Sequence, residues 1–396
     1  MQMPKAPDSI ELRHLRSFVA VAEELNFGRA ADRLFLSQPA LSRQIKMLER
    51  IMGCQLLKRS THLVELTLAG EVFLSRVRPL MADLNHAVSE TRSIGDQAAD
   101  RATRMTMTVL EHTGTLDALS QMRAAFEALN AQLPIPTGIE VRAANAAGTP
   151  SLVVGADVEQ PPSILMLHGG AYVMGSAFGY RPLAGALSAA TGATVLVPDY
   201  RLAPEHPYPA ALDDAQRAFD WLLEIGVDPQ QVTVTGDSSG GGLAMSLLIR
   251  LQQRQLPMPG RAALLSPGLD LTGNVTERTN DSVDLHDQWE ACVAAYLSDT
   301  SPDDRTLNPL TTELDGLPPL LIQVGTGDYV LDEATTLADH AINAGVDARL
   351  DLYPVATHVF HLFWSFLPEA AEAIDNVVRF IADTGGASTR QGAAVG

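Results

Sequence analysis

The feature that most constrains this chain is the stretch Val232-Thr-Val-Thr-Gly-Asp-Ser-Ser-Gly-Gly-Gly-Leu-Ala-Met245. Its β-branched beginning predicts a strand, and the small residues from Gly240 onward predict the start of a helix. The pentapeptide Gly236-Asp-Ser-Ser-Gly240 fits G-x-S-x-G, with glycines where so tight a turn leaves no room for side chains. Ser238 is the central serine, because centring the motif on Ser239 would put Asp237 at a glycine position. Taken alone, the pentapeptide also fits a glycine-rich turn between a strand and a helix that has no catalytic role.

The surrounding sequence predicts the sheet to which this turn belongs. Short apolar strands alternate with helical stretches, which predicts a mostly parallel sheet covered by helices on both faces. These strands lie near residues 164–167, 193–197, 232–235, 262–265, 320–324 and 349–353, and an antiparallel pair precedes them near 139–142 and 151–154. In such sheets, active sites and ligand-binding sites form at the carboxyl ends of the strands.

Polar residues follow three of these predicted strands. His168-Gly-Gly-Ala-Tyr172 follows the first parallel strand and offers backbone N–H donors among small residues, as an oxyanion in acyl transfer requires. Asp328 follows a later strand, and His358 follows the last one. The order Ser238, Asp328, His358 is the order of nucleophile, acid and base in α/β-hydrolases.

Together these motifs resemble the hormone-sensitive-lipase branch of the α/β-hydrolases, over roughly residues 105–385. The resemblance implies that His358 deprotonates Ser238 while Asp328 orients its ring. It also implies a cap from about 105 to 135 that sets acyl size, and an oxyanion hole at Gly169, Gly170, Ala171 and Ser239, with N–H donors from the last three. The departure is Ala171, where the family motif has a third glycine; its methyl group narrows the pocket or alters the preferred alcohol.

Each assignment has a competitor among neighbouring residues. Asp332 and Glu333 are alternative acids, although Asp328 lies nearer the end of its strand. His361 is a second candidate base, and His168 is a residue that we expect to brace the oxyanion loop. Structural roles are also expected for Asp199, Arg201, Glu205, Asp213 and Asp270.

The N-terminal segment has a different character. Residues 1–60 hold ten Lys and Arg against six Asp and Glu, whereas the whole chain holds 28 against 47 and a net charge of −19. Apolar spacing predicts a helix from Leu12, a short second helix from Arg29, and a third helix capped by Ser37 that ends near Arg50. Polar donors and cations near the start of this third helix are typical of side chains that contact base edges and phosphates in a major groove. The candidate DNA-binding residues are Ser37, Gln38, Ser42, Arg43, Gln44 and Lys46.

These residues resemble the winged helix-turn-helix of LysR-type transcriptional regulators. The segments that match are Leu12-Arg-His-Leu-Arg-Ser-Phe-Val-Ala-Val-Ala-Glu, Ser37-Gln-Pro-Ala-Leu-Ser-Arg-Gln-Ile and Leu66-Thr-Leu-Ala-Gly. The resemblance implies binding to double-stranded DNA and a long helix from Ala69 that pairs two subunits. His62 and Glu65 in the expected wing depart from the family, which often places arginines there for phosphate contact.

We therefore predict a multidomain chain. An all-α winged helix-turn-helix would span residues 9–68, a linker or dimerisation helix 69–96, the α/β-hydrolase 105–385, and a disordered tail 386–396. The small polar run from Gly95 to Thr103 is expected to be a linker. A homo-oligomer, dimer or tetramer, follows from the resemblance.

Composition excludes several other classes. Cys54 and Cys292 are too few for a disulfide framework or a cysteine-rich metal site, so we expect no metal and no cofactor. No apolar run approaches membrane-spanning length, and no apolar targeting segment is found, so we expect a cytoplasmic protein.

Two hypotheses of function follow. In the first, a serine carboxylesterase acts on small or medium acyl esters and is fused to a DNA-binding head. In the second, a transcription regulator uses the hydrolase domain as a ligand sensor with little or no turnover; the complete triad favours the first. A third interpretation is that the head only dimerises and no longer binds DNA.

Overall fold

The computed structural model describes residues 10–34, 36–59, 64–110, 119–272 and 285–383. The chain divides into two compact units, which meet in sequence between Ile94 and Gly95. The expected tail at 386–396, the middle of the expected cap at 111–118, and His62 of the expected wing lie outside the described residues. Among the helices that are described, none combines the length and the apolar character needed to cross a bilayer.

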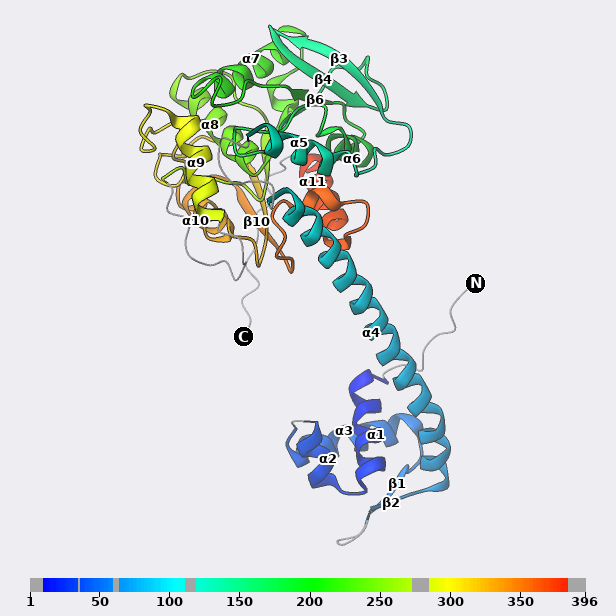
Figure 1. Ribbon diagram of the computed structural model, residues 1–396. Helices are drawn as coiled ribbons and strands as arrows, with labels where there is room; N and C mark the ends of the chain where they lie inside the picture. The colour runs from blue at the N-terminus through cyan, green and yellow to red at the C-terminus, as the bar shows by residue number, and fades with distance from the viewer. Residues whose placement is uncertain (1–9, 35, 60–63, 111–118, 273–284, 384–396) are drawn as a thin grey trace. The chain divides into compact units, whose positions relative to one another are not determined.

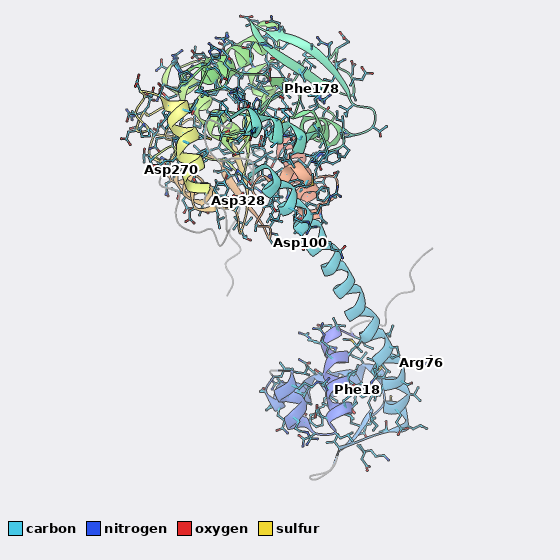
Figure 2. The ribbon with its side chains drawn as sticks, in the orientation of Figure 1. Phe18, Arg76, Asp100, Phe178, Asp270 and Asp328 are labelled. Atoms are coloured by element: carbon cyan, nitrogen blue, oxygen red, sulfur yellow. The ribbon has the colours of Figure 1, made fainter. Side chains whose placement is uncertain are left out.

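The N-terminal unit is a set of short helices followed by a two-stranded hairpin. The antiparallel hairpin pairs Leu57 with Leu66. The ring of Phe18 packs against Phe73 with centroids 5.2 Å apart, and Figure 2 labels Phe18 within this unit. The remaining core side chains are apolar residues at helical spacing, among them Val21, Leu41, Ile45 and Leu48. The elements are α1 (Leu12–Glu24), α2 (Phe27–Arg33), α3 (Gln38–Met52), β1 (Leu57–Arg59) and β2 (Val64–Leu66).

Helix α3 begins where its capping residues require. Ser37 has extended backbone angles, and its hydroxyl accepts a hydrogen bond from the Ala40 N–H at 3.4 Å. Pro39 lies in the first turn, where its missing N–H costs nothing. Gly53 ends the helix in the left-handed conformation. The expected N-cap at Ser37 is confirmed.

Helix α4 (Leu68–Leu110) starts on a hydroxyl cap and a close backbone approach. The Thr67 side chain accepts from the Gly70 N–H at 3.0 Å and donates to the Gln55 carbonyl at 2.8 Å. A Cβ atom on Gly70 would lie 2.1 Å from the Leu56 carbonyl oxygen, so only glycine fits there. These contacts fix the first turn of α4 to the hairpin.

The run from Gly95 to Thr103 is helical and belongs to α4, whereas we expected a linker there. The small side chains that suggested a linker instead pack against the second unit. Ala102 is fully buried, and Ala98, Ala99 and Met105 pack against the same hydrophobic cluster of the second unit. Their spacing puts them along one side of the helix, where small residues allow close packing.

The second unit is built on an eight-stranded sheet with the order β10-β9-β8-β7-β5-β6-β4-β3. Figure 1 labels β3, β4, β6 and β10 of this sheet. The pairs β3–β4 and β4–β6 are antiparallel, and the other neighbours are parallel, which confirms the predicted mostly parallel sheet. The strands are β3 (Glu140–Ala146), β4 (Thr149–Gly155), β5 (Ile164–Leu167), β6 (Val195–Pro198), β7 (Thr233–Asp237), β8 (Arg261–Leu265), β9 (Leu320–Gly325) and β10 (Ala348–Tyr353).

Alternating side chains of the buried strands supply a core on each face of the sheet. In β5, Leu165 and Leu167 belong to one hydrophobic cluster, and Ile164 and Met166 belong to the other. Helices α7, α8 and α10 contribute to the first cluster, and α6 and α11 contribute to the second. The helices are α5 (Leu119–Asn130), α6 (Arg181–Thr191), α7 (Ala210–Glu224), α8 (Ser239–Gln253), α9 (Leu285–Leu297), α10 (Leu331–Asn343) and α11 (Pro368–Ala382), with short 3₁₀ turns η2 (Pro229–Gln231) and η3 (Phe360–Phe363).

Candidate active site

Ser238 occupies the sharp turn between β7 and α8. Its backbone is strained, with φ 49° and ψ −124°, and it is half-buried, whereas every other residue from Val232 to Leu251 is buried. A Cβ atom on Gly236 would lie 2.3 Å from the Gly240 carbonyl oxygen, and one on Gly240 would lie 2.1 Å from the Leu167 carbonyl oxygen. The turn therefore excludes side chains at both flanking positions, as the sequence predicts.

Three side chains from three different strand ends meet at this turn. The His358 Nε2 lies 2.9 Å from the Ser238 Oγ, and its Nδ1 lies 2.9 and 3.1 Å from the two carboxylate oxygens of Asp328. Asp328, labelled in Figure 2, follows β9, and its side chain is fully buried. A carboxylate at Nδ1 fixes the proton there and leaves Nε2 free to accept a proton from the serine.

The loop that bears His358 is held in an unusual conformation. Val359 adopts the left-handed region, with φ 49° and ψ 45°, although a β-branched residue is disfavoured there. The ring of Tyr329 packs against the His358 ring with centroids 4.4 Å apart. Strain of this kind persists only where the surrounding packing holds it in place.

The competing acids and base occupy other environments. Asp332 lies in the first turn of α10. The Glu333 carboxylate accepts from the N–H groups of Leu269 and Asp270 at 2.6 and 2.8 Å, and burial raises its pKa to about 7. His361 is completely buried, makes no hydrogen bond within the described part of the chain, and has its pKa lowered by burial to about 3. Of these candidate acids and bases, Asp328 and His358 form the hydrogen-bonded pair beside Ser238.

The loop after β5 lies beside the serine. Gly170 has φ 125°, and a Cβ atom on it would lie 2.2 Å from the Met174 carbonyl oxygen. Ala171 and Tyr172 also have positive φ, at 52° and 63°. Within the described residues, the N–H groups of Gly170, Ala171 and Ser239 donate to no protein acceptor, so they are available to a ligand.

Gly169 differs from its neighbours in this loop. Its N–H donates to Oδ1 of Asp237 at 2.9 Å, so it is already engaged within the protein. The second oxygen of Asp237 accepts from the Tyr180 hydroxyl at 2.7 Å. Burial raises the pKa of this carboxyl to about 6. No role was expected for Asp237, because its position in G-x-S-x-G accepts any residue.

His168 braces the loop, in agreement with the expectation for it. The residue is fully buried, its Nδ1 lies 2.8 Å from the Gly169 carbonyl oxygen, and its ring stacks on Tyr200 at 4.1 Å. The Tyr200 hydroxyl donates to the His168 carbonyl oxygen at 2.6 Å. Burial lowers the pKa of His168 to about 4, so its ring is neutral at physiological pH.

Arg123, which no sequence motif singled out, joins helix α5 to the same loop. The Arg123 Nε donates to the Val173 carbonyl oxygen at 2.7 Å. Its guanidinium also binds both carboxylate oxygens of Glu205 at 2.7 Å and the Ala203 carbonyl oxygen at 3.1 Å. The hydrogen bonds from Arg123 lower the pKa of Glu205 to about 2. Nothing in the local sequence around Arg123 pairs it with a residue 82 positions away.

Comparisons with known proteins bear on both units. Residues 164–362 match a family described as alpha/beta hydrolase fold, and residues 12–71 match the bacterial regulatory helix-turn-helix proteins of the lysR family. An acetyl-hydrolase of Streptomyces hygroscopicus is 39% identical over 227 residues, covering 55% of this chain and 75% of that protein. The chain belongs to the α/β-hydrolase fold family. Its N-terminal helices are a LysR-type helix-turn-helix.

Further relatives of this α/β-hydrolase are named as esterases. An esterase of Acinetobacter venetianus is 34% identical, covering 65% of this chain and 87% of that protein. The crystal structure of an esterase from the bacterial hormone-sensitive lipase family superposes with a TM-score of 0.66 at 33% identity, covering 72% of this chain and 97% of that one. The structure of EstE5 soaked with p-nitrophenyl butyrate superposes with a TM-score of 0.62 at 36% identity, covering 66% and 90%.

In the helix-turn-helix unit, the predicted DNA-contacting residues lie on the first three turns of α3 and its cap. Ser37, Gln38, Arg43 and Lys46 are exposed. Gln44 is half-buried, and its side-chain oxygen accepts a hydrogen bond from Ser17 of α1, so it joins the two helices. Ser42 is also half-buried.

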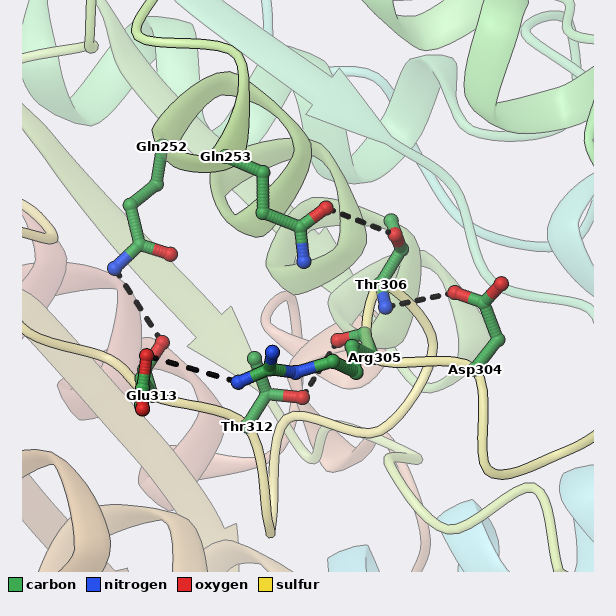
Figure 3. Close-up of a pocket in the computed structure, with 7 residues that line it drawn as sticks. All are labelled: Gln252, Gln253, Asp304, Arg305, Thr306, Thr312 and Glu313. Carbon is green, nitrogen blue, oxygen red and sulfur yellow. Dashed lines mark hydrogen bonds and ion pairs between the residues drawn. The ribbon is translucent and has the colours of Figure 1, made fainter.

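The hydrolase unit also has a polar surface cavity of about 420 Å³ that contains none of these groups (Figure 3). Its lining includes Arg305, which forms an ion pair with Glu313 at 3.6 Å, and Thr306, which bonds to Gln253. The cavity lies at the C-terminal end of α8, whereas Ser238 precedes the N-terminal end of that helix. It therefore has no part in the candidate active site.

Proposed function

We propose that this α/β-hydrolase cleaves small or medium acyl esters through a covalent acyl-enzyme on Ser238. The observation that supports the proposal is the continuous hydrogen-bonded chain from the Ser238 Oγ through His358 to the buried Asp328. The wider class, carboxylic ester hydrolase, is the one to which its named relatives belong.

In the first half of the reaction, the Ser238 Oγ attacks the ester carbonyl while His358 Nε2 takes the serine proton. Asp328 holds the opposite nitrogen and stabilises the imidazolium that forms. The carbonyl oxygen becomes an oxyanion, for which the free N–H groups of Gly170, Ala171 and Ser239 are the proposed donors. When the tetrahedral intermediate collapses, the alcohol leaves with the proton from His358, and the acyl group remains on Ser238.

In the second half, a water molecule attacks the acyl-enzyme and gives its proton to His358. The acid then leaves, and the proton returns to Ser238. Gly169 is absent from the proposed donor set because its N–H is bound to Asp237.

The test is hydrolysis of p-nitrophenyl esters with a series of acyl lengths. We expect turnover that is highest on short chains and lost by at least about 10³-fold in Ser238→Ala. Ser239→Ala is the neighbouring control: it removes a hydroxyl that accepts from the Tyr172 N–H at 3.3 Å, so part of the activity should remain. Turnover in Ser238→Ala equal to wild type would reject the nucleophile.

For the N-terminal unit we propose binding to double-stranded DNA and a role in transcription. The support is the match to the lysR family and the exposed cations Arg43 and Lys46 on α3. The expected residues 9–68 would form this domain, with 69–96 as the connecting helix and 105–385 as the hydrolase. Binding of a fluorescent duplex with a steep salt dependence would support this part of the proposal.

We also propose that α4 pairs two copies of the chain. Leu68, Val72 and Leu80 on this helix are 79%, 59% and 61% exposed, and they are spaced four and eight residues apart. Exposure of these apolar side chains to water is unfavourable, and packing against a second helix would bury them. Sedimentation equilibrium should give a dimer or tetramer, and a monomer at micromolar concentration would reject this assembly.

A further inference from the structure

The C-terminal end of α4 packs on the part of the hydrolase unit that bears the catalytic histidine. Ala102 is fully buried in a hydrophobic cluster that also contains Val355, Val359 and Phe360. The guanidinium carbon of Arg101 lies 4.1 Å from the centroid of the Phe366 ring. This contact is therefore made by apolar packing and a cation over an aromatic face.

One hydrogen bond joins the helix directly to the histidine loop. The hydroxyl oxygens of Thr103 and Thr357 lie 3.0 Å apart, and Thr357 is only 7% exposed. Thr357 immediately precedes His358, and the strained Val359 immediately follows it. The histidine is thus held from two sides, by Ser238 and Asp328 at its ring and by α4 at its backbone neighbour.

The same helix belongs to both units along the chain. It begins at Leu68, where its first turn is capped by Thr67 and packed on Leu56, and it ends at Leu110 beyond the contact with Thr357. A single helix therefore runs along the chain from the helix-turn-helix unit to Thr103, which is hydrogen-bonded to the residue next to His358. No other described element joins the two units.

We propose that the end of α4 positions His358 through the Thr103–Thr357 hydrogen bond, and that this contact couples the chemical state of Ser238 to DNA binding. In the free enzyme His358 accepts a hydrogen bond from Ser238. Once Ser238 is esterified, its oxygen has no proton to donate, so one of the contacts that hold the strained loop is lost. Thr357 transmits the change to α4, and by linkage DNA binding changes the esterase in return.

The coupling rests on the proposed function, whereas the positioning of His358 rests only on the esterase activity. The first measurement is therefore kinetic, with p-nitrophenyl butyrate as substrate. Thr103→Val removes the hydroxyl at nearly constant volume, and we expect kcat to fall by about threefold to tenfold with KM unchanged, as for one lost hydrogen bond. Thr103→Ser restores the hydroxyl and should restore kcat.

The matched control is Thr106→Val, one turn further along the same helix. The Thr106 hydroxyl donates to the Ala102 carbonyl oxygen within α4, so its loss should leave kcat unchanged. Equal kcat in Thr103→Val and wild type, or equal losses in the Thr103→Val and Thr106→Val variants, would overturn the positioning role.

The second measurement uses the full chain and a covalent probe. Diethyl p-nitrophenyl phosphate transfers its diethylphosphoryl group to the Ser238 Oγ and releases p-nitrophenolate, and the serine proton leaves by way of His358 to solvent. Affinity for a fluorescein-labelled duplex of mixed sequence is measured by anisotropy before and after the reaction. We expect the Kd to change by at least about threefold in wild type and in Thr106→Val, and to stay constant in Thr103→Val and in Ser238→Ala treated alike.

The possible failures are distinguishable. Untreated protein that does not bind the duplex would reject the DNA-binding function and the coupling with it, while the kinetic arm still tests the positioning role. A protein that binds DNA and is phosphorylated at Ser238, yet keeps the same Kd, would overturn the coupling alone. A shift of equal size in Thr103→Val would also overturn it.

Discussion

The carboxylate of Asp237 accepts a hydrogen bond from the Gly169 N–H at 2.9 Å, which joins the turn at Ser238 to the loop after β5. The approach is so close that a Cβ atom on Gly169 would lie 2.4 Å from the other Asp237 oxygen. Asp237, the residue before Ser238, therefore sets where the next two N–H groups of the loop lie. A motif position that accepts any residue in the pattern has a defined structural role in this chain.

Asp237→Asn should lower kcat/KM by about tenfold. The amide oxygen still accepts from Gly169, but the NH₂ group faces the Tyr180 hydroxyl, which must reorient from donor to acceptor. Asp237→Ala should cost more, because it leaves two buried donors without partners at about 1–3 kcal/mol each. The assay is hydrolysis of p-nitrophenyl butyrate with urea unfolding in parallel. Full activity in Asp237→Ala would contradict this role.

Ala171→Gly should change the preference of the enzyme for the alcohol part of the ester. Ala171 has φ 52°, a conformation that glycine adopts without penalty and alanine does not. The relief of about 1 kcal/mol is offset by the greater freedom of glycine in the unfolded chain, so stability should change little. Removal of the methyl group should raise kcat/KM for bulky alcohol esters more than for ethyl esters. If the ratio of kcat/KM between Ala171→Gly and wild type were the same for every alcohol in the series, the steric role of Ala171 would be rejected.

Much of the hydrolase unit was predictable because its constraints are local. The alternation of short apolar strands and helices gave the sheet, and the glycines at Gly236 and Gly240 are dictated by backbone contacts within one turn. Ser238, Asp328 and His358 follow strand ends, and parallel strands bring their carboxyl ends to one edge. The structure brings these three side chains together as expected.

The contacts of Arg123, Ala102 and Gln44 depend on tertiary packing, which no local sequence pattern predicts. Arg123, on α5, reaches the Val173 carbonyl oxygen in the loop after β5 through tertiary packing. The run from Gly95 to Thr103 was predicted to be a linker because its residues are small and polar. The helix forms because burial of Ala102 against the hydrolase cluster stabilises it more than the low helix propensity of these residues opposes it. In α3, Gln44 stays a predicted DNA contact, and the hydrogen bond that its side-chain oxygen accepts from Ser17 is a tertiary contact of this kind.

Arg123→Met should lower kcat while leaving the acyl-length preference unchanged. The variant loses the donors to the Val173 and Ala203 carbonyl oxygens and leaves Glu205 without its partner, so the loop after β5 is held less firmly. Arg123→Lys should be intermediate, because one ammonium cannot reproduce the forked geometry. Arg142→Met is the matched control, since Arg142 also binds a carbonyl oxygen, that of Val158, away from the serine. Equal losses of kcat in Arg123→Met and Arg142→Met would show a general effect on stability instead.

Glu333 should make the hydrolase unit less stable as pH rises from about 4.5 to about 7. Burial raises the pKa of this carboxyl to about 7, so between those values the folded state holds a proton that the unfolded chain has lost. The free energy of unfolding therefore falls over this window, by up to about 3 kcal/mol at 1.4 kcal/mol per pKa unit. Glu333→Gln keeps an acceptor for Leu269 and Asp270 but does not titrate, so it should match wild type at pH 5 and exceed it at pH 8. Urea unfolding at both pH values measures this, and parallel pH profiles would disprove the assignment.

Arg43 and Lys46 should each contribute one phosphate contact to DNA binding. Both are exposed on α3, and the loss of either should lower the slope of log K against log salt by about 0.9, the value per neutralised phosphate. Arg33→Ala is the control for charge alone, because its guanidinium is paired with Glu23 at 2.9 Å. We expect the Arg43→Ala and Lys46→Ala variants to show shallower slopes on a duplex of mixed sequence, and Arg33→Ala to keep the slope of wild type. A wild-type slope near zero would instead support a head that only dimerises, since phosphate contacts cannot form without releasing counterions.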